Sequence, residues 1–414
     1  MLLSSTLRQV MNMPVAALRM NYPLFYEQLI GTNCLVDEET NESFLLKKRI
    51  CAIDENPKSY QLTINPTISC NFKCWYCYEN HYKTQMEEYV LISTKRFIAK
   101  IMQNPELEFF NLSFFGGEPL LYYWKIVLPI LEHFNLCKKK FPKISTFIHF
   151  TTNGYLLNER MITNLKEQQV SSFQITLDGT REEHDQTRFP YKGGKSYDKI
   201  TRNVIALLQN GFHVTLRLNY TAKNAERMKE IIPLFIRLSN QEKKNLIVDF
   251  QQVWQDRDSQ NEQNERTQAY IEECIDLFAE QQIMTSHHYH NYVWDSCYAD
   301  KKNSAVINYN GDVYKCTARD FSTANREGYL SSNGEIIFWN LDKYRLRRTI
   351  RLSRTECQQC RIAPLCGGAC AQKQIERQNN SLSCLLGYTE EIKDQIILDK
   401  FYVDIVKPDL QVCK

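Results

Sequence analysis

Six strand-like runs alternate with amphipathic helical runs in the middle of this 414-residue chain. The strand-like runs are rich in β-branched and aromatic residues, and they lie at residues 60–68, 109–115, 145–152, 172–178, 213–221 and 246–254. They mostly lack clean apolar and polar alternation, which is typical of strands that are buried on both faces. A repeated βα order predicts a parallel sheet. The predicted fold class is α/β, a partial (β/α)6 TIM-like barrel, with a doubly wound open sheet as the alternative.

The helical runs between these strands show where the predicted units begin and end. They lie at residues 87–102, 158–169, 196–211 and 224–238. The third is preceded by Gly194 and followed by Asn210-Gly211, which is typical of a helix C-cap. Active sites of such barrels lie where strands end and loops begin, so the residues after each strand are the candidate site.

Three cysteines with the spacing CxxxCxxC follow the first predicted strand directly. Cys70, Cys74 and Cys77 lie in the segment ISCNFKCWYC. A four-iron four-sulfur cluster usually takes four thiolates, so three would leave one iron free for an external ligand. Part of a zinc site and a set of buried structural cysteines remain alternatives, because zinc also binds closely spaced thiolates.

Polar and glycine-containing segments follow the next three predicted strands. They are FFGGEP (114–119), TTNG (151–154), QITLDG (174–179) and HDQTR (184–188). Gly116 and Gly117 would let the backbone approach a ligand closely, and Glu118 supplies a hydrogen-bond acceptor. Short polar side chains suit ribose hydroxyls, and an arginine suits a carboxylate. Each segment alone is also compatible with an ordinary turn.

Composition and charge exclude several classes of protein. Lys and Arg number 51 against 48 Asp and Glu, so the net charge of +3 favours neither a nucleic-acid nor a membrane partner. No run approaches the roughly 20 apolar residues of a membrane span, and no signal peptide is evident. Fifteen cysteines in such a chain favour metal or redox chemistry in a reducing compartment over a disulfide scaffold. We therefore expect a cytoplasmic protein.

A second group of cysteines lies toward the C-terminus. Its members are Cys297, Cys316, Cys357, Cys360, Cys366, Cys370 and Cys384. The first pair is accompanied by Gly311 in a GxxxxC arrangement, and residues 357–370 have the spacing CxxCxxxxxCxxxC. The CQQC segment alone would be typical of a zinc ribbon, but seven cysteines in this order indicate a larger metal-binding region.

In this order, the segments resemble the radical S-adenosylmethionine (SAM) enzymes, in particular their peptide- and protein-modifying branch. The resemblance rests on LTINPTISCNFKCWYCYE, SFFGGEPLL, TTNG and ITLDGTREEHDQTR, and it covers roughly residues 60–385. It implies an oxidoreductase in which Cys70, Cys74 and Cys77 hold a [4Fe-4S] cluster whose open iron chelates SAM. One electron from that cluster would cleave SAM to a 5′-deoxyadenosyl radical, which abstracts a substrate hydrogen.

The same resemblance implies roles for further residues. Gly116, Gly117 and Glu118 would bind the methionine amino group of SAM, with Thr176 near the ribose and Arg188 as a further cofactor contact. The C-terminal cysteines resemble a SPASM domain with two auxiliary [4Fe-4S] clusters, which makes three clusters in all. The outer cluster would be held by Cys357, Cys360, Cys366 and Cys384, and the inner one by Cys297, Cys316 and Cys370.

Two departures from the sulfatase-maturing branch bear on the reaction. Asn303 and Thr317 stand where that branch has a further cysteine and an aspartate base, so we do not expect formylglycine formation. An inner cluster with three protein ligands suits a substrate cysteine thiolate, which predicts a thioether crosslink. In a first alternative, a further cysteine such as Cys413 or Cys51 completes the inner cluster, and the reaction is carbon–carbon (cyclophane-type) crosslinking or another oxidative peptide modification. In a second alternative, the chain is a non-catalytic iron–sulfur or zinc protein that binds peptides.

The resemblance also suggests partners and a domain division. We expect a ribosomal precursor peptide as substrate and a flavodoxin or ferredoxin-type electron donor. Residues 22–49 suggest a helix, a turn and a short strand, about half of a leader-peptide-binding module, so a separate leader-binding protein is a possible partner. The predicted parts are 1–58, an N-terminal segment with a possible partial leader-recognition element; 59–285, the partial barrel; 286–390, the SPASM domain; and 391–414, a C-terminal helix and tail.

The remaining features have simpler interpretations. Cys34, Cys137 and Cys274 lie in apolar surroundings and are predicted to be packing residues. The HHYH segment at 287–290 is interpreted as a linker, and Trp75 and Tyr76 are predicted to shield the cluster from water.

Overall fold

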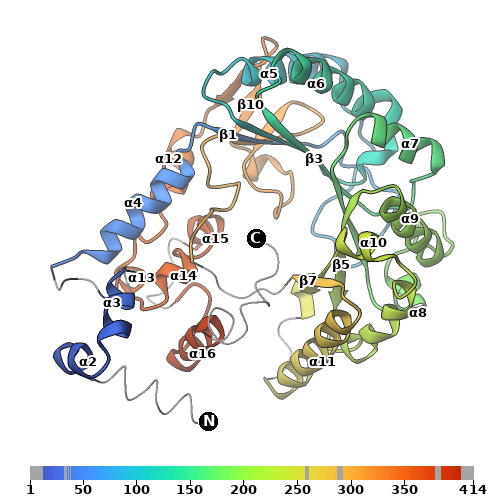
Figure 1. The fold of residues 1–414 in the computed structure, drawn as a ribbon. Helices are drawn as coiled ribbons and strands as arrows, with labels where there is room; N and C mark the ends of the chain where they lie inside the picture. The colour runs from blue at the N-terminus through green and yellow to red at the C-terminus, as the bar shows by residue number, and fades with distance from the viewer. Residues whose placement is uncertain are drawn as a thin grey trace. The chain divides into compact units, whose positions relative to one another are not determined.

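The computed structural model describes most of the chain as two compact units, residues 1–48 and residues 49–414 (Figure 1). The described residues are 13–31, 35, 37, 39–256, 261–286, 292–377 and 384–401, with the side chains of 261–264 excepted. Cys34, Cys413 and the segment 287–290 lie outside them. Each unit is described by itself.

The described part of the first unit is helical. Its elements are α2 (Val15–Asn21), α3 (Pro23–Gly31) and the first part of α4 (Glu42–Asp54). No strand forms in the described part of residues 22–49, contrary to the prediction of a short strand there, and the apolar run FLL lies inside α4. The side chain of Asn41 accepts a hydrogen bond from the backbone N–H of Phe44, which caps the first turn of that helix.

The second unit is built on a parallel sheet that contains all six predicted strands. They are β1 (Ser59–Ile64), β2 (Phe109–Phe114), β3 (Ser145–Thr152), β4 (Ser172–Leu177), β5 (His213–Tyr220) and β6 (Leu246–Gln252). Each strand pairs in parallel with the next one along the chain, so their order is the sequence order. In a doubly wound sheet the strand order reverses at a switch point, and among β1 to β6 it does not reverse. The βα units therefore follow one another as in a barrel, although the sheet stays open.

The sheet continues beyond these six strands at both ends. The additional strands are β7 (Met284–Ser286), β8 (Ser304–Ile307), β9 (Asp312–Tyr314), β10 (Gly328–Leu330) and β11 (Ile336–Phe338). β7 pairs with β6, whereas β8 pairs in parallel with β1 and leads into the antiparallel strands β9 to β11. The cysteine-rich part thus begins as a direct extension of the sheet, and the predicted boundary at 285/286 falls within one compact unit.

Helices cover one side of the sheet (Figure 1). They are α5 (Glu88–Met102), α6 (Leu128–Lys140), α7 (Glu159–Glu167), α8 (Arg181–Thr187), α9 (Tyr197–Gln209), α10 (Asn240–Lys244) and α11 (Asn261–Glu280), with the short elements η1 (Pro119–Tyr122), η2 (Tyr123–Val127), η3 (Ala225–Leu234) and η4 (Trp254–Asp256). The predicted helices 87–102, 158–169 and 196–211 are confirmed as α5, α7 and α9. The fourth, 224–238, is instead a 3₁₀ helix containing Pro233, which has no N–H for the α-helical bond.

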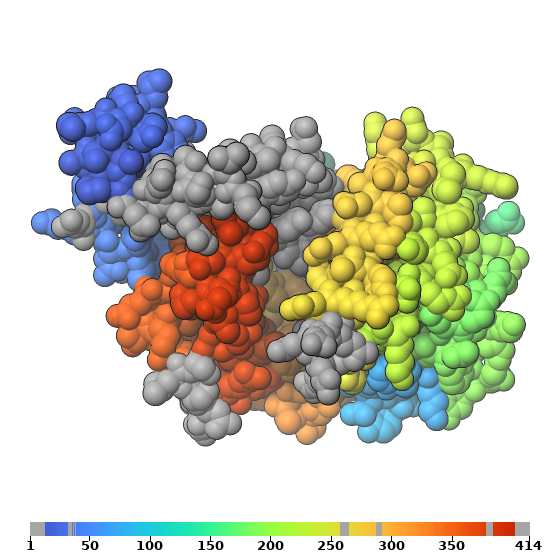
Figure 2. All heavy atoms as spheres, turned by 90° about the horizontal axis from the view of Figure 1, so that it is seen from below, coloured from blue at the N-terminus to red at the C-terminus, as the bar shows by residue number. Residues whose placement is uncertain are grey.

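Short helices follow the last strands of the sheet. They are α12 (Leu341–Thr349), α13 (Thr355–Gln358), α14 (Ala363–Cys366), α15 (Ala371–Glu376) and α16 (Glu390–Phe401), the last of which overlaps the predicted C-terminal segment 391–414. The short helix η5 (Thr323–Asn325) lies between β9 and β10. In Figure 2 these elements, orange to red, and α11, yellow, lie on opposite sides of a recess. No described helix is long and apolar enough to cross a bilayer.

The strands alternate cleanly, contrary to the prediction from their sequences. In β1, for example, Leu62 and Ile64 are buried, whereas Gln61 and Thr63 line a cavity. The polar positions are mostly Thr, Ser, Asn and Gln rather than charged residues, so the contrast along each run is weak. Alternation gives the sheet one apolar face and one polar face.

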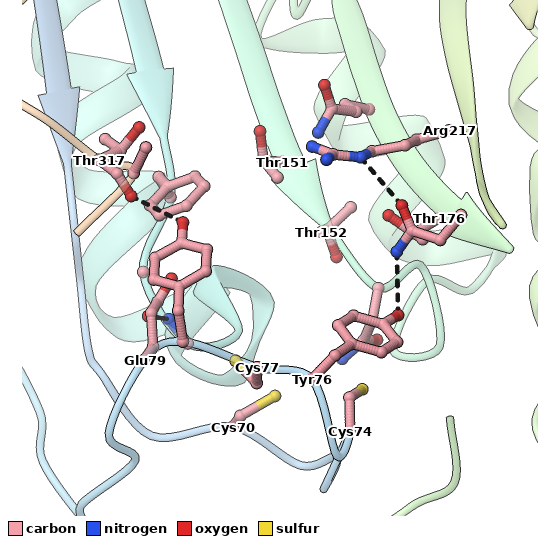
Figure 3. Close-up of a pocket in the computed structure, with 18 of the residues that line it drawn as sticks. Cys70, Cys74, Tyr76, Cys77, Glu79, Thr151, Thr152, Thr176, Arg217 and Thr317 are labelled. Carbon is pink, nitrogen blue, oxygen red and sulfur yellow. Dashed lines mark hydrogen bonds between the residues drawn. The ribbon is translucent and has the colours of Figure 1, made fainter. Parts of the chain in front are cut away.

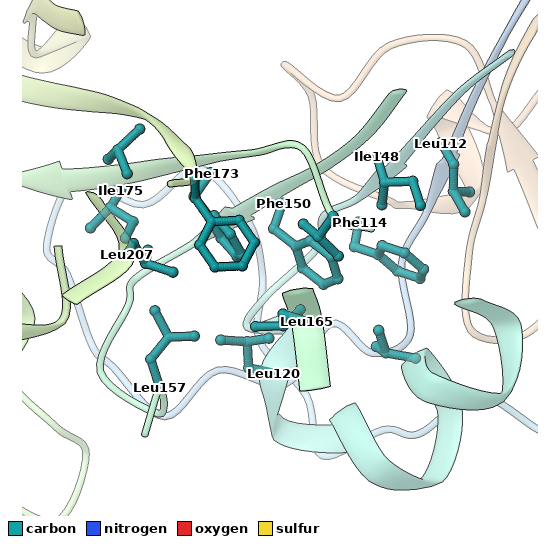
Figure 4. Packing of buried hydrophobic residues seen from close by; sticks show 14 of the residues in the cluster. Leu112, Phe114, Leu120, Ile148, Phe150, Leu157, Leu165, Phe173, Ile175 and Leu207 are labelled. Carbon is teal, nitrogen blue, oxygen red and sulfur yellow. The ribbon is translucent and has the colours of Figure 1, made fainter. Parts of the chain in front are cut away.

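The apolar face packs as one continuous core against the helices (Figure 4). Phe114, Phe150 and Phe173 come from three adjacent strands, and their rings stack at centroid distances of 4.7 and 5.6 Å. All three side chains are fully buried. Cys137 and Cys274 also lie in this core, which confirms their predicted packing role.

Candidate active site

The polar face of the sheet lines a cavity of about 590 Å³, a size usual for small-molecule sites. Each of the strands β1 to β6 contributes at least one side chain to it. These residues are Gln61, Thr63, Asn111, Ser113, His149, Thr151, Thr152, Gln174, Thr176, Arg217, Asn219 and Gln252. The cavity is closed by the loop after β1 and by part of the C-terminal region, which brings together segments far apart in the sequence.

The cysteine loop after β1 forms one wall of this cavity (Figure 3). Cys70, Cys74 and Cys77 all line it, and none is in a disulfide. Burial raises the pKa of the Cys70 thiol to about 12, with a smaller contribution from Glu118. Burial likewise raises the pKa values of Cys74 and Cys77. These thiols therefore stay protonated unless a metal centre ionises them.

The donor set fits an iron–sulfur cluster better than a single metal ion. Among the described residues, no three His, Cys, Asp or Glu side chains are close enough to share one ion. A zinc ion requires its sulfur ligands at about 2.3 Å from one centre, whereas the thiolates of a four-iron cluster are distributed over its iron atoms. Three free, soft thiols around one cavity suit the wider arrangement.

The Gly116-Gly117 turn after β2 packs against the start of the cysteine loop. Both glycines have positive φ values, +78° and +45°. A Cβ on Gly116 would lie 2.6 Å from Cγ of Asn65, and one on Gly117 would collide with the carbonyl oxygen of Ser69. The backbone N–H of Glu118 also donates to Ser69 O at 2.9 Å. Glycine is therefore needed here for close packing of two loops, and both glycines line the cavity.

Glu118 is fully buried and does not line the cavity. Its Oε1 accepts hydrogen bonds from Leu120 N at 3.0 Å and from Thr152 Oγ1 at 2.7 Å. Its Oε2 accepts one from Asn153 N at 2.8 Å. Burial raises the pKa of this carboxyl group despite these donors. Glu118 thus ties the loop after β2 to the end of β3, and its predicted contact with a cofactor stays a prediction.

A polar network surrounds the hydroxyl group of Tyr76. This hydroxyl donates to the Asp178 carboxylate at 2.7 Å and accepts from Arg188 Nη1 at 2.7 Å and from Asn219 Nδ2 at 3.1 Å. The predicted site residue Arg188 lines the cavity together with the predicted Thr176. Tyr76 therefore fixes the cysteine loop to β4 and β5 (Figure 3).

The neighbouring Trp75 lies differently. It is 59% exposed, so it does not have the shielding role that the sequence suggested.

Glu79 is a cavity residue that the sequence analysis missed. Its Oε2 accepts a hydrogen bond from the Gly117 N–H at 2.9 Å, and its own backbone N–H bonds to the Cys77 sulfur. Burial raises the pKa of its carboxyl group. In the sequence it lies in the polar segment YENHYK, where nothing distinguishes it from a solvated surface charge.

An adjoining part of the cavity wall is formed by Tyr298, Thr317 and Ala318. The Tyr298 hydroxyl accepts from Thr317 N at 2.7 Å and lies 2.6 Å from Thr317 Oγ1. The Tyr78 hydroxyl donates to the Thr317 carbonyl at 2.7 Å, which links this wall to the cysteine loop. Asn303 does not line the cavity, and its side chain donates hydrogen bonds to the backbone carbonyls of Asn56 and Pro57, just before β1.

The structure brings the predicted inner set of cysteines together. Burial raises the pKa of Cys297 to about 12, and smaller contributions come from Asp300 and from Cys316 and Cys370. Tyr298 and Thr317, which line the cavity, directly follow Cys297 and Cys316 in the chain. Cys51, one candidate for an additional ligand, is exposed.

The structure also groups the predicted outer set. Burial raises the pKa of Cys357, with smaller contributions from Cys366, Cys384 and Cys360. The pKa of Cys366 is raised mainly by burial as well, and Cys384 and Cys360 add to the shift. All four are free cysteines.

Comparison with known proteins agrees with this site. The family model described as the radical SAM superfamily matches residues 64–234. A cysteine-type anaerobic sulfatase-maturating enzyme of Clostridium novyi is 29% identical over 154 residues, which are 36% of this chain and 40% of the relative. The chain aligns with 40% to 64% of the length of the first curated relatives.

Two solved structures share the fold over most of their length. One is anSMEcpe with bound AdoMet, with a TM-score of 0.61, 18% identity and coverage of 85% of this chain and 98% of that one. The other is Streptococcus suis SuiB bound to the precursor peptide SuiA, with a TM-score of 0.54, 16% identity and coverage of 85% and 86%. At these identities the likeness shows the fold alone. The family match, together with the cysteine loop after β1, therefore identifies a radical SAM domain at residues 64–234.

Proposed function

We propose that this enzyme is a peptide maturase that installs a thioether crosslink in a ribosomal precursor peptide. The observation that carries the proposal is the composition of the cavity wall. One part of the wall is formed by the cysteine loop, and another by Tyr298 and Thr317, which directly follow the inner-set cysteines Cys297 and Cys316 in the chain. A side chain bound in this cavity would therefore lie beside the cysteine loop and close to the residues that follow two inner-set cysteines.

The chain's own residues would position the cofactors. Cys70, Cys74 and Cys77 would hold a [4Fe-4S] cluster, and this cluster with SAM supplies a 5′-deoxyadenosyl radical for hydrogen abstraction. The Gly116-Gly117 turn, Thr176 and Arg188 line the same cavity and would bind SAM. Arg188 carries the positive charge that suits the carboxylate of SAM, and its bond to Tyr76 fixes its orientation.

The wall around Thr317 argues against sulfatase-type chemistry. Burial raises the pKa of the Tyr298 phenol, so its hydroxyl stays neutral beside Thr317. This part of the wall therefore offers hydroxyl groups and no carboxylate base. The absence of a carboxylate at position 317 suits a reaction in which a thiol of the substrate, rather than an aspartate of the enzyme at this position, participates.

The inner cysteine set favours a thioether product. Cys297, Cys316 and Cys370 supply three thiolates, and we assign the fourth thiolate to a cysteine of the substrate. A substrate thiol ionises readily on a metal centre, which would hold its sulfur beside the cavity. A third cluster would be held by Cys357, Cys360, Cys366 and Cys384, so the enzyme would hold three [4Fe-4S] clusters in all.

The precursor peptide is the expected partner because of the substrates of related proteins. SuiB, which shares the fold, has been solved with a precursor peptide. We also propose a flavodoxin or ferredoxin-type electron donor. A role of the N-terminal segment in leader recognition, with or without a separate leader-binding protein, remains a proposal.

The test is anaerobic turnover with peptides encoded next to the enzyme, followed by mass spectrometry. A thioether forms when a C–H and an S–H bond are replaced by a C–S bond. The 5′-deoxyadenosyl radical would take the hydrogen atom of the C–H bond, the thiol would lose its proton to solvent, and a cluster would accept the remaining electron. The product should therefore lose two hydrogen atoms and one alkylatable thiol. A peptide with Ser in place of that Cys should remain unmodified. Loss of two hydrogen atoms from the Ser peptide would contradict the thioether and favour a carbon–carbon crosslink.

A further inference from the structure

Arg217 is a cation of the cavity that the proposed cofactor contacts do not use. It lies in β5 between Leu216 and Leu218, which are both fully buried in the core. Because side chains alternate along a strand, the Arg217 side chain leaves the opposite face of the sheet. It lines the cavity there and is half-buried (Figure 3). A molecule bound in the cavity can therefore reach this guanidinium group.

One hydrogen bond fixes the orientation of the Arg217 guanidinium. Its Nε donates to Asn219 Oδ1 at 3.1 Å, and Asn219 Nδ2 in turn donates to the Tyr76 hydroxyl at 3.1 Å. Within the described part of the chain, no acceptor bonds to Nη1 or Nη2 of Arg217. Two parallel N–H donors on a rigid guanidinium are the arrangement that binds a carboxylate in a bidentate manner.

Among the described residues, no acidic side chain forms an ion pair with Arg217. Asp249 is its register partner on β6, but the Asp249 carboxylate accepts hydrogen bonds from Gln251 Nε2 at 3.1 Å and from the Ser286 hydroxyl. Glu79 is the one acid among the described residues that line the cavity, and it bonds to the glycine turn instead. A cation without a counter-ion in a cavity favours an anionic ligand.

The two arginines of the cavity lie at different distances from the cysteine loop. Burial raises the pKa values of the three thiols of the loop, and the charge of Arg188 opposes this shift at all three. Arg188 also bonds to the Tyr76 hydroxyl directly. Arg217 instead lies two residues before Asn219, about 7 Å further along β5 from the loop. Arg188 therefore suits a ligand held at the loop, and Arg217 suits a second anionic group.

We propose that Arg217 binds a carboxylate of the peptide substrate. This inference rests on the proposed function, and it deepens that function by naming a feature of the substrate. SAM has one carboxylate, for which Arg188 is the proposed partner, so the carboxylate at Arg217 comes from the peptide. It is the side chain of an Asp or Glu close to the modified residue, or the C-terminal carboxylate.

The test measures the binding of SAM and of the peptides encoded next to the enzyme, by anaerobic equilibrium dialysis on the full chain with its clusters reconstituted. Arg217→Gln should weaken peptide binding about tenfold or more, the usual effect of losing a charge-assisted hydrogen bond, and should change SAM binding less than about threefold. Arg217→Lys keeps the charge and should restore part of the affinity for the peptide. Arg237→Gln, which removes an exposed arginine outside the cavity lining, should change neither affinity.

Peptide variants identify the carboxylate. Each Asp and Glu of the peptide is replaced singly by Asn or Gln, and a further peptide is amidated at its C-terminus. One of these changes should weaken binding to the wild type about tenfold but have no further effect on Arg217→Gln, because both changes remove the same pair. An equal loss of SAM and peptide affinity in Arg217→Gln, or a loss that no peptide change shares, would overturn the proposal.

A small probe separates this inference from the proposed function. If the wild type binds none of the encoded peptides, the peptide substrate is contradicted, and the carboxylate site is tested with N-acetylglutamate α-methylamide and its neutral glutamine analogue. In saturation-transfer NMR, the wild type should bind the acid about tenfold more tightly than Arg217→Gln does, and the neutral analogue should not distinguish the two proteins. Equal binding of the acid to both proteins, or no binding to the wild type, would overturn the proposal.

Discussion

Replacing Glu118 by Gln tests whether its carboxylate holds two loops together. The change keeps size and shape but replaces one carboxylate oxygen by an NH₂ group. In the structure, Oε1 accepts hydrogen bonds from the Leu120 N–H and the Thr152 hydroxyl, and Oε2 accepts one from the backbone N–H of Asn153. Glutamine can keep its oxygen in the position of Oε1. Its NH₂ group then lies in the position of Oε2 and faces the Asn153 N–H, so two donors meet and that N–H has no acceptor.

The expected cost follows from this geometry. Leaving one buried N–H without an acceptor costs about 1–3 kcal/mol, and the site is fully buried, so water does not screen it. Glu118→Ala removes both acceptor oxygens and all three hydrogen bonds, including the cap of η1, and should cost about 3–5 kcal/mol. The Gln variant should therefore lie between the wild type and the Ala variant in its free energy of unfolding.

The assay is urea unfolding of the reduced, metal-free protein under anaerobic conditions, followed by tryptophan fluorescence. Glu159→Gln is the matched control, since Glu159 is exposed in the first turn of α7 and should change stability by less than about 0.5 kcal/mol. The reasoning would be refuted if Glu118→Gln unfolded like the wild type but bound SAM at least about tenfold more weakly. The carboxylate would then act on the cofactor rather than on the loops.

Two further predictions concern the C-terminal region. Burial raises the pKa of Asp300 from 3.8 to about 6, a difference worth about 3 kcal/mol at 1.36 kcal/mol per unit. A raised folded-state pKa means that the free energy of unfolding falls as the pH rises through that value. Between about pH 4 and 7, the free energy of unfolding of Asp300→Asn should therefore fall by about 3 kcal/mol less than that of the wild type. Parallel curves of unfolding free energy against pH for the two proteins would contradict this. In electron paramagnetic resonance, a Cys-containing precursor should perturb the signal of the cluster on Cys297, Cys316 and Cys370, whereas a Ser peptide should not, because thiolate is the soft ligand that binds iron. Identical spectra with both peptides would rule out the substrate thiolate.

The strands could be predicted from the sequence because β-branched and aromatic residues cluster in short runs. The alternation of buried and cavity-lining residues along these strands could not be predicted, because residues such as Thr63 and Ser113 line the cavity but have only weakly polar side chains. The α-helix predicted at 224–238 is instead a 3₁₀ helix from Ala225 to Leu234, with Pro233 near its end. The strand expected before the sheet failed because the apolar residues of α4 also suit a helix.

The site shows a similar division. Its cysteines and glycines could be found by their spacing, and the structure brings them to one cavity. The direction of the Glu118 side chain could not be predicted, because Gly116 and Gly117 both have positive φ values that redirect the chain just before it. Glu79 escaped detection because its partner, the Gly117 N–H, lies 38 residues away.

The most direct test of the account is to replace Cys70, Cys74 and Cys77 together by Ala. After anaerobic reconstitution, the wild type should hold about twelve iron atoms and the variant about eight, because one of three four-iron clusters is lost. Cys137→Ala, which removes a buried thiol outside all three sets, should keep the full iron content. With dithionite and SAM, the wild type should form 5′-deoxyadenosine and the triple variant should form none. Formation of 5′-deoxyadenosine by the triple variant at the wild-type rate would contradict the central claim.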